Sequence, residues 1–420
     1  MTVGVSRLSA ALADRLLAYT LFAGVTSAAG LPIYIYAPKY YADTYGVSLT
    51  LLGTVLFGLR LFDIFQDPLL GWFAERLQRG KALAVTIGAA IMALSMIGLF
   101  AVPPPVAPIW WFGITITGLF TAFAFLTINF YAQGIAKAGN APGGHVRLAA
   151  WRESGSLLGV CIAAVAPTLL MSFTSAPFAV FAIGFAVACG IAALVMWPEW
   201  RGQTHPDPTS IRTIVADPLA LRLMVLALVN GAPLACSSTL FLFYVESRLA
   251  APGWEGPLLV LFFLAAAVSS PFWGALARRF GEKRTLLLAM VLALIFFAFT
   301  ATLGPGDVVK FAVICVLSGA TIGADLTLLP AMFARLMAAI SPNGGQGFGL
   351  WAMVNKFTLA FAAASMLPLL DWSGFQAGDT VQPALAMTML MLLYAVVPSL
   401  LKLLAIALLA AIKLEEPAWP

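Results

Sequence analysis

Long apolar stretches separated by short polar breaks run through the whole chain. A window of about 20 apolar residues is the length that crosses a bilayer as a helix. This window finds twelve stretches, six before the longest polar break and six after it. The predicted membrane-crossing helices cover residues 16–37, 47–73, 82–103, 109–136, 148–172, 177–197, 218–246, 256–277, 285–303, 308–334, 345–370 and 383–412.

The longest polar break divides the predicted helices into two sets of six. Six helices, a linker and six more helices are the layout of the major facilitator fold, an all-α polytopic membrane fold. We therefore predict an N-terminal six-helix bundle over residues 1–197, a cytoplasmic linker over 198–217 and a C-terminal six-helix bundle over 218–420.

Composition and charge fit a membrane protein. The chain is 61% apolar and 10% charged, whereas a soluble domain carries about 25% charged residues. With both termini inside, 15 Lys and Arg fall on the cytoplasmic side, and only Lys39, Arg248 and Lys310 fall outside. We expect an integral protein of a bacterial inner (plasma) membrane with cytoplasmic termini and no cleavable signal peptide. The basic excess reports orientation and does not predict nucleic-acid binding.

Three charged residues interrupt the second apolar stretch. Arg60, Asp63 and Asp67 stand at i, i+3 and i+7, so a helix places them on one stripe. A charge at the centre of a membrane helix costs about 2.5–3.5 kcal/mol. The stripe is therefore expected to face counter-charges, a bound cation, a proton or a water-filled cavity, and not lipid.

An internal repeat shows that the scaffold does not require these carboxylates. The segment Pro68–Lys81 recurs as Pro271–Arg284, at an offset of 203 residues. At the same offset, Asp63 becomes Ala266 and Asp67 becomes Ser270. Two related halves are typical of transporters that rock about a central site.

Two carboxylates one turn apart can bind Na⁺ or can share one proton. Either event changes the charge of the site by one unit, and this predicts cation coupling. Gln66 and Thr127 can add neutral oxygens, and Arg60 and the mid-helix Lys356 are the predicted counter-charges. The alternative is a buried ion pair that only fixes helix packing.

The motifs resemble those of the glycoside–pentoside–hexuronide:cation symporters. They are Tyr40–Gly46, Leu52–Thr54 and Arg60-x-x-Asp63-x-x-x-Asp67-Pro68-x-x-Gly71. The resemblance implies that Asp63 and Asp67 are the coupling carboxylates and Lys356 is their partner. Arg152 resembles the helix-5 arginine of that family, and the segment 323–330 around Asp325 is also similar to it. Vertebrate sodium-dependent lysolipid transporters share the aspartate motif.

The chain departs from the sugar-binding pattern of that family. Ser27 stands where the helix-1 carboxylate is expected, and Thr127 stands where the helix-4 aspartate is expected. Polar and aromatic residues at membrane depth are the candidates for solute binding, although each can instead serve packing or helix–helix hydrogen bonding. These candidates are Ser27, Tyr34, Asn129, Tyr131, Arg152, Glu153, Asn230, Asp325, Trp351 and Asn355.

The function predicted from the sequence is symport of a small polar organic solute, such as a sugar or glycoside, with H⁺ or Na⁺. The alternative is a lipid or lysolipid transporter on the same scaffold. An enzyme is not expected, because the two histidines, His145 and His205, fall in separate predicted loops and no nucleophile–base spacing appears. A channel fits the two-half repeat less well. We expect a monomer in the lipid bilayer, with no cofactor other than a bound Na⁺ if Na⁺ is the coupling ion.

Overall fold

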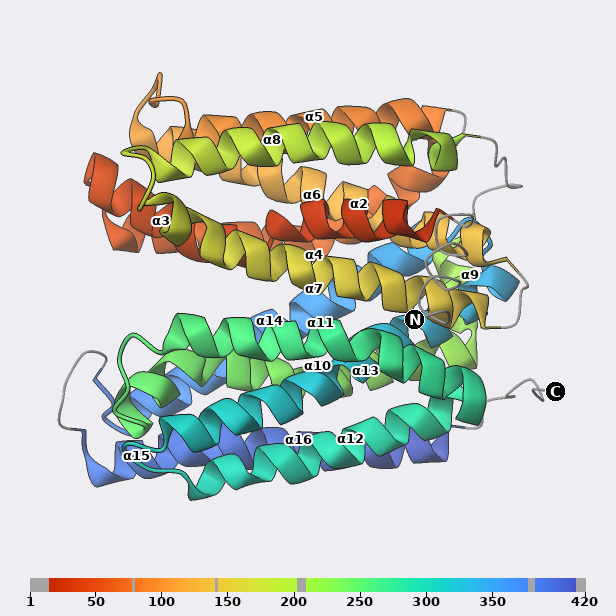
Figure 1. The fold of residues 1–420 in the computed structure, drawn as a ribbon. Helices are drawn as coiled ribbons and strands as arrows, with labels where there is room; N and C mark the ends of the chain where they lie inside the picture. Colours follow the sequence, from red (N-terminus) through yellow and green to blue (C-terminus); the bar gives the residue numbers. More distant parts are fainter. Residues whose placement is uncertain (1–14, 78–79, 140–142, 202–208, 377–381, 413–420) are drawn as a thin grey trace, which may run out of the picture. The chain divides into compact units, whose positions relative to one another are not determined.

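The computed structural model describes residues 15–77, 80–139, 143–201, 209–376 and 382–412, and this part of the chain folds into helices joined by turns (Figure 1). Within these described ranges, ten helices are long and apolar enough to cross a membrane, and α2 is a shorter apolar helix. The prediction of an all-α polytopic membrane protein is confirmed. Residues 202–208 of the predicted linker and both chain ends lie outside the described residues.

The helices up to the linker follow the order predicted from the apolar stretches. They are α2 (Leu16–Ala28), α3 (Leu31–Tyr45), α4 (Leu49–Arg76), α5 (Lys81–Phe100), α6 (Pro108–Ala138), α7 (Gly144–Leu170), α8 (Pro177–Met196), the short 3₁₀ turn Trp197–Trp200 and α9 (Ile211–Ala216). The first predicted crossing is divided, because α2 ends before Gly30 and α3 begins after it. His145 was predicted in a loop, but it lies in the first turn of α7.

The remaining helices also follow the predicted order. They are α10 (Pro218–Phe243), continued by a π-helical turn to Arg248, α11 (Glu255–Phe280), α12 (Glu282–Ala298) with a 3₁₀ turn to Thr302, α13 (Val308–Ile340), α14 (Gly345–Trp372), α15 (Ala384–Met391) and α16 (Val397–Ala411), the last two joined by a π-helical turn. Helix α13 runs six residues past its predicted end and stops at Ile340. Pro342 follows, and a proline disfavours the helical conformation in the residue before it.

Packing divides the chain into two compact units, which we describe separately. The N-terminal unit contains Met1–Ile214 and also Ala334–Met353, the segment that includes the turn between α13 and α14. The C-terminal unit contains Val215–Phe333 and Val354–Pro420.

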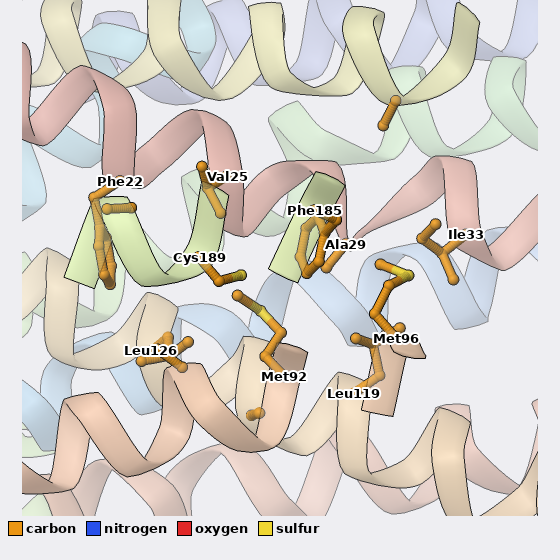
Figure 2. Packing of buried hydrophobic residues seen from close by; sticks show 14 of the residues in the cluster. Phe22, Val25, Ala29, Ile33, Met92, Met96, Leu119, Leu126, Phe185 and Cys189 are labelled. Carbon is orange, nitrogen blue, oxygen red and sulfur yellow. The ribbon is translucent and has the colours of Figure 1, made fainter. Parts of the chain in front are cut away.

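The N-terminal unit has an apolar core between α2, α5, α6 and α8. Phe22, Met92, Leu126 and Cys189 point into it from these four helices (Figure 2). Helices α5 and α8 lie side by side along its length (Figure 1). The core holds the helices against one another, so that polar side chains on α4, α6 and α7 have fixed neighbours.

Glycines set the closest helix contacts in each unit. Gly155 and Gly159 on α7 lie directly against the backbone of α2, and a methyl group at either position would collide with it. Gly319 and Gly323 on α13 lie in the same way against α11 in the C-terminal unit. Small residues four apart allow this approach, which drives helix association where no water is available to favour apolar burial.

The C-terminal unit has an aromatic core at one end. The rings of Tyr244 and Tyr394 stack with centroids 4.0 Å apart, and Phe311 packs against both. The Tyr244 hydroxyl donates to the Thr300 carbonyl at 2.7 Å, which satisfies this polar atom where the stacking buries it.

Candidate functional site

Helix α4 turns its charged stripe inward and its apolar face outward. Asp67 is fully buried, whereas Phe65 and Leu69 are 74% and 66% exposed. Asp63 and Gln66 are also buried. This arrangement removes the carboxylates from the face that lipid would contact, as the cost of a charge in hydrocarbon requires.

Gln66 and Thr127 carry oxygens that a cation could use. The Gln66 amide oxygen accepts a hydrogen bond from the Thr121 hydroxyl of α6 at 3.3 Å. Thr127 is half-buried on the same helix as Thr121. Carboxylate, amide and hydroxyl oxygens are the donors that suit a hard cation. In the described part of the chain, no three His, Cys, Asp or Glu side chains cluster as a transition-metal site would require.

Glu75 lies further along α4 and holds the α13–α14 turn. It follows Asp67 by eight residues, so it is a little over two helical turns away and rotated by about 80° around the helix axis. Its carboxylate accepts hydrogen bonds from the backbone N–H of Gln346 at 2.8 Å, from the Gln346 side-chain amide at 3.1 Å and from the Thr209 N–H at 3.2 Å. Glu75 was not among the predicted site residues, although its spacing from Asp67 was a usable signal.

Close backbone packing accompanies these hydrogen bonds. A methyl group on Gly71 would collide with the backbone of Gly345, and one on Gly349 would collide with the backbone at Asp67. Phe348 packs against Tyr131 of α6, with ring centroids 5.0 Å apart. The start of α14 is therefore fixed to the aspartate-bearing part of α4 inside the N-terminal unit.

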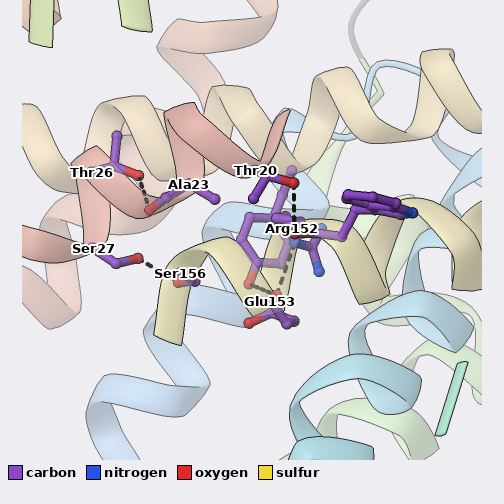
Figure 3. Close-up of polar contacts among 9 residues, drawn as sticks. Thr20, Ala23, Thr26, Ser27, Arg152, Glu153 and Ser156 are labelled. Carbon is purple, nitrogen blue, oxygen red and sulfur yellow. Dashed lines mark hydrogen bonds and ion pairs between the residues drawn. The ribbon is translucent and has the colours of Figure 1, made fainter. Parts of the chain in front are cut away.

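A second polar cluster joins α6 and α7 (Figure 3). Arg152 Nε donates to Glu153 Oε1 at 2.8 Å, and the Tyr131 hydroxyl donates to the same oxygen at 3.0 Å. The Arg152 guanidinium also lies 3.6 Å from the centre of the Tyr131 ring. Both charged side chains are buried, yet Arg152 Nη2 has no hydrogen-bond partner among the described residues. The cluster thus keeps one charged donor available to a bound molecule.

A third cluster lies in the C-terminal unit. Lys402 Nζ of α16 donates to Asn230 Oδ1 of α10 at 2.7 Å and to Asp325 Oδ2 of α13 at 2.5 Å. All three side chains are buried. The sequence singled out Asn230 and Asp325 but not Lys402, whose position in the middle of an apolar stretch was the available signal.

The chain matches a known protein family over most of its length. The model of the family described as MFS/sugar transport protein matches residues 19–416. The chain belongs to this family. It is therefore a membrane transporter of the major facilitator superfamily, whereas the finer resemblance to the glycoside–pentoside–hexuronide:cation symporters stays a prediction.

One curated relative and several solved structures resemble this transporter. The cyanate transport protein CynX of Escherichia coli (strain K12) is 28% identical over 195 residues, which are 44% of this chain and 50% of that protein. The chain thus spans about half the length of that relative. A bacterial homologue of the iron transporter ferroportin, in its outward-facing state, has a TM-score of 0.72 at 14% identity, covering 95% of this chain and 98% of that one.

The human organic anion transporter MFSD10 (TETRAN) shares the fold as well. Its TM-score is 0.66 at 16% identity, and the alignment covers 94% of this chain and 99% of that one. At these identities the two structures support the fold alone. The prediction of the major facilitator fold is confirmed by them.

The structure brings some predicted site residues together inside one unit and leaves others apart. Tyr131, Arg152 and Glu153 form one cluster, and Asn230 and Asp325 share Lys402. Lys356 belongs to the C-terminal unit and the two aspartates belong to the N-terminal unit. The expected pairing of Lys356 with Asp63 and Asp67 therefore stays a prediction.

The other predicted residues have individual surroundings. Ser27 shares a hydrogen bond with Ser156 across α2 and α7 (Figure 3), and the Asn129 side chain donates to the Phe125 carbonyl of its own helix at 2.9 Å. Trp351 is buried and Asn355 is exposed. The side chains of Arg60 and Tyr34 lie outside what the structure describes.

Proposed function

We propose that this transporter moves a small polar organic solute across the membrane together with H⁺ or Na⁺, and that Asp63 and Asp67 take up the coupling cation. The observation that carries the proposal is the burial of both carboxylates on the inner face of α4, whose outer face is apolar. A ligand shifts a conformational equilibrium only through its different affinity for the two states. Neutralising a buried negative charge supplies a large difference of this kind.

Gln66 and Thr127 would add neutral oxygens to a Na⁺ ion at these carboxylates. Lys356 would be the fixed positive charge that replaces the cation after its release. The resemblance to the glycoside–pentoside–hexuronide:cation symporters supports the role of Lys356. Arg60 is a second possible counter-charge on the same stripe.

The cluster of Tyr131, Arg152 and Glu153 is our candidate for contact with the solute. A buried arginine that retains an unused N–H can bind a hydroxyl, a carbonyl or an anionic oxygen. The tyrosine ring beside it offers a flat apolar face. A sugar or glycoside fits these features, as the description of the matched family suggests.

Transport of a small organic anion is the second candidate, because the unused donor of Arg152 carries a positive charge. Of the relatives described above, one is named for cyanate, one for organic anions and one as a homologue of an iron transporter, and none is named for a lipid. We therefore do not carry the lipid alternative forward. We also propose that the protein lies in a bacterial inner membrane with both termini in the cytoplasm.

Uptake by proteoliposomes that contain the purified protein tests this function. Labelled sugars, glycosides and small carboxylates would be offered under an imposed pH gradient, an imposed Na⁺ gradient or neither. The proposal expects at least one solute to accumulate above its outside concentration only under one of the two gradients. If every solute that enters is taken up equally under the pH gradient, under the Na⁺ gradient and under neither, cation coupling is contradicted.

A further inference from the structure

The C-terminal unit contains a cavity that is lined by its own helices. Its volume is about 110 Å³, and residues of α10, α11, α12, α13 and α16 line it. Most of the wall is apolar, with Phe262, Phe297 and Ile314 among its residues. An engineered cavity of about 150 Å³ holds a benzene ring, so this cavity suits a molecule of roughly that size or smaller.

Lys402 and Asn230 lie in the wall together with serine hydroxyls, of which those of Ser318 and Ser399 donate to carbonyls of their own helices. The ammonium group of Lys402 has three N–H donors, and two of them are used by Asn230 and Asp325. The third remains for a molecule inside the cavity. Asp325 Oδ1 is buried and has no hydrogen-bond partner among the described residues. The cluster thus retains one charged donor and one negatively charged acceptor in an apolar setting.

We propose that this cavity binds a small organic monoacid with an apolar body, and that one proton enters with each acid. The carboxylate would accept a hydrogen bond from Lys402, and its carbon skeleton would occupy the apolar part of the cavity. The proton would go to Asp325. A protonated monoacid uses the cationic donor, the spare carboxylate oxygen and the apolar wall together.

Charge balance explains why the proton is needed. Lys402 and Asp325 together are neutral, so a carboxylate alone would bring an uncompensated negative charge into a low-dielectric site. Protonation of Asp325 frees Lys402 to pair with the ligand, and the occupied site is neutral again. The same balance holds if the proton stays on the ligand and is donated to Asp325 Oδ1, so the stoichiometry does not depend on its position.

The charge balance of the site depends on Lys402 and Asp325, because the neighbouring groups are uncharged. Cys315 and Tyr394 are the other titratable side chains of the cavity wall. A thiol and a phenol ordinarily lose their protons only above neutral pH, so both groups are uncharged there. A buried ion pair that served packing alone would not need a cavity beside the lysine, because such pairs are stabilised by filled, fully hydrogen-bonded surroundings.

Calorimetric titration of the full-length purified protein with butyrate, and with butyramide as the uncharged control, tests the proposal. Repeating the titration in two buffers of different ionisation enthalpy gives the protons taken up per ligand. We expect butyrate to bind with about one proton, and its affinity to fall about tenfold per pH unit above neutral pH by linkage. Butyramide is expected to bind at least tenfold more weakly. Equal affinity for both compounds, or binding without proton uptake, would overturn the proposal.

Two variants separate the roles of the charged residues. Asp325→Asn leaves Lys402 able to bind butyrate without a proton, so affinity should persist and vary less than twofold per pH unit. The neutral double variant Lys402→Met with Asp325→Asn should lose at least tenfold in affinity. If the pair only fixes helix packing, neither variant would change the proton count, and that result would refute the site.

A cavity-filling variant and a surface variant complete the test. Ala293→Phe fills the cavity without touching the charged pair and should also abolish binding of butyrate. Asp307→Asn removes a carboxylate that pairs with Lys310 at 2.8 Å outside the membrane-spanning segments, and it should leave binding unchanged. Binding that survives Ala293→Phe would place butyrate elsewhere. The result is independent of Asp63 and Asp67, so a failure here would leave the proposed coupling untouched.

Discussion

Replacing Glu75 by alanine should loosen the start of α14 within the N-terminal unit. The change removes two hydrogen bonds to Gln346, at 2.8 and 3.1 Å, and one to the Thr209 N–H at 3.2 Å. A hydrogen bond to a charged group contributes about 1.5–3 kcal/mol. The two buried bonds to Gln346 alone are therefore worth on the order of 3 kcal/mol at the low end of that range.

The assay is amide hydrogen exchange of the segment that contains Gln346. If opening of this segment limits exchange, 3 kcal/mol less stability speeds exchange by roughly a hundredfold or more, since about 1.4 kcal/mol corresponds to a factor of ten. Glu75→Gln keeps the size and one acceptor oxygen, so we expect an increase of about tenfold. Exchange elsewhere in the N-terminal unit should change much less.

Glu255→Ala is the matched control for this experiment. The Glu255 carboxylate also accepts hydrogen bonds from a backbone N–H, that of Gly253, at 2.9 and 3.1 Å, but in an exposed turn of the C-terminal unit. It should not alter exchange around Gln346. Unchanged exchange there in Glu75→Ala would refute the view that this carboxylate holds the α13–α14 turn.

Three further predictions concern packing, the solute and the counter-charge. Gly155→Leu forces a side chain into the backbone of α2, so it should abolish folded protein or lower its melting temperature strongly. The control Gly184→Ala meets open space and should melt like the unaltered protein. Equal melting temperatures for both variants would contradict the packing argument. Tyr131→Phe removes the 3.0 Å hydrogen bond to Glu153, worth about 1 kcal/mol, so solute affinity measured by titration should fall about fivefold, and no change would exclude the cluster from the solute site. Lys356→Ala should shift the pH or Na⁺ dependence of uptake, and an unchanged profile would remove Lys356 from the coupling site.

The inward face of α4 was predictable because it follows from local physics. Asp63 and Asp67 share a helical stripe, and the cost of a charge in lipid decides which way the stripe must face. The structure buries both residues and exposes Phe65 and Leu69. The helical class of the fold was predictable in the same way, because apolar segments of about 20 residues have the length of a membrane-crossing helix.

Partners far apart in the sequence were not predictable. Glu75 and Gln346 are 271 positions apart, and Asp325 and Lys402 are 77 apart. Periodicity gives the face of a helix but does not say which other helix covers it. The sequence alone therefore shows Lys402 only as a lysine in an apolar stretch. Its contact with Asn230 depends on how three helices pack.

The account depends most on the claim that the α4 carboxylates couple a cation to solute movement. The direct measurement is solute accumulation against solute exchange in proteoliposomes containing Asp67→Asn, with Ser270→Ala as the control. Ser270 is the equivalent residue in the second half, where its hydroxyl donates to the Ala266 carbonyl at 2.8 Å. We predict that Asp67→Asn loses gradient-driven accumulation and keeps exchange, while Ser270→Ala keeps both. Accumulation by Asp67→Asn at the level of the unaltered protein would contradict the claim.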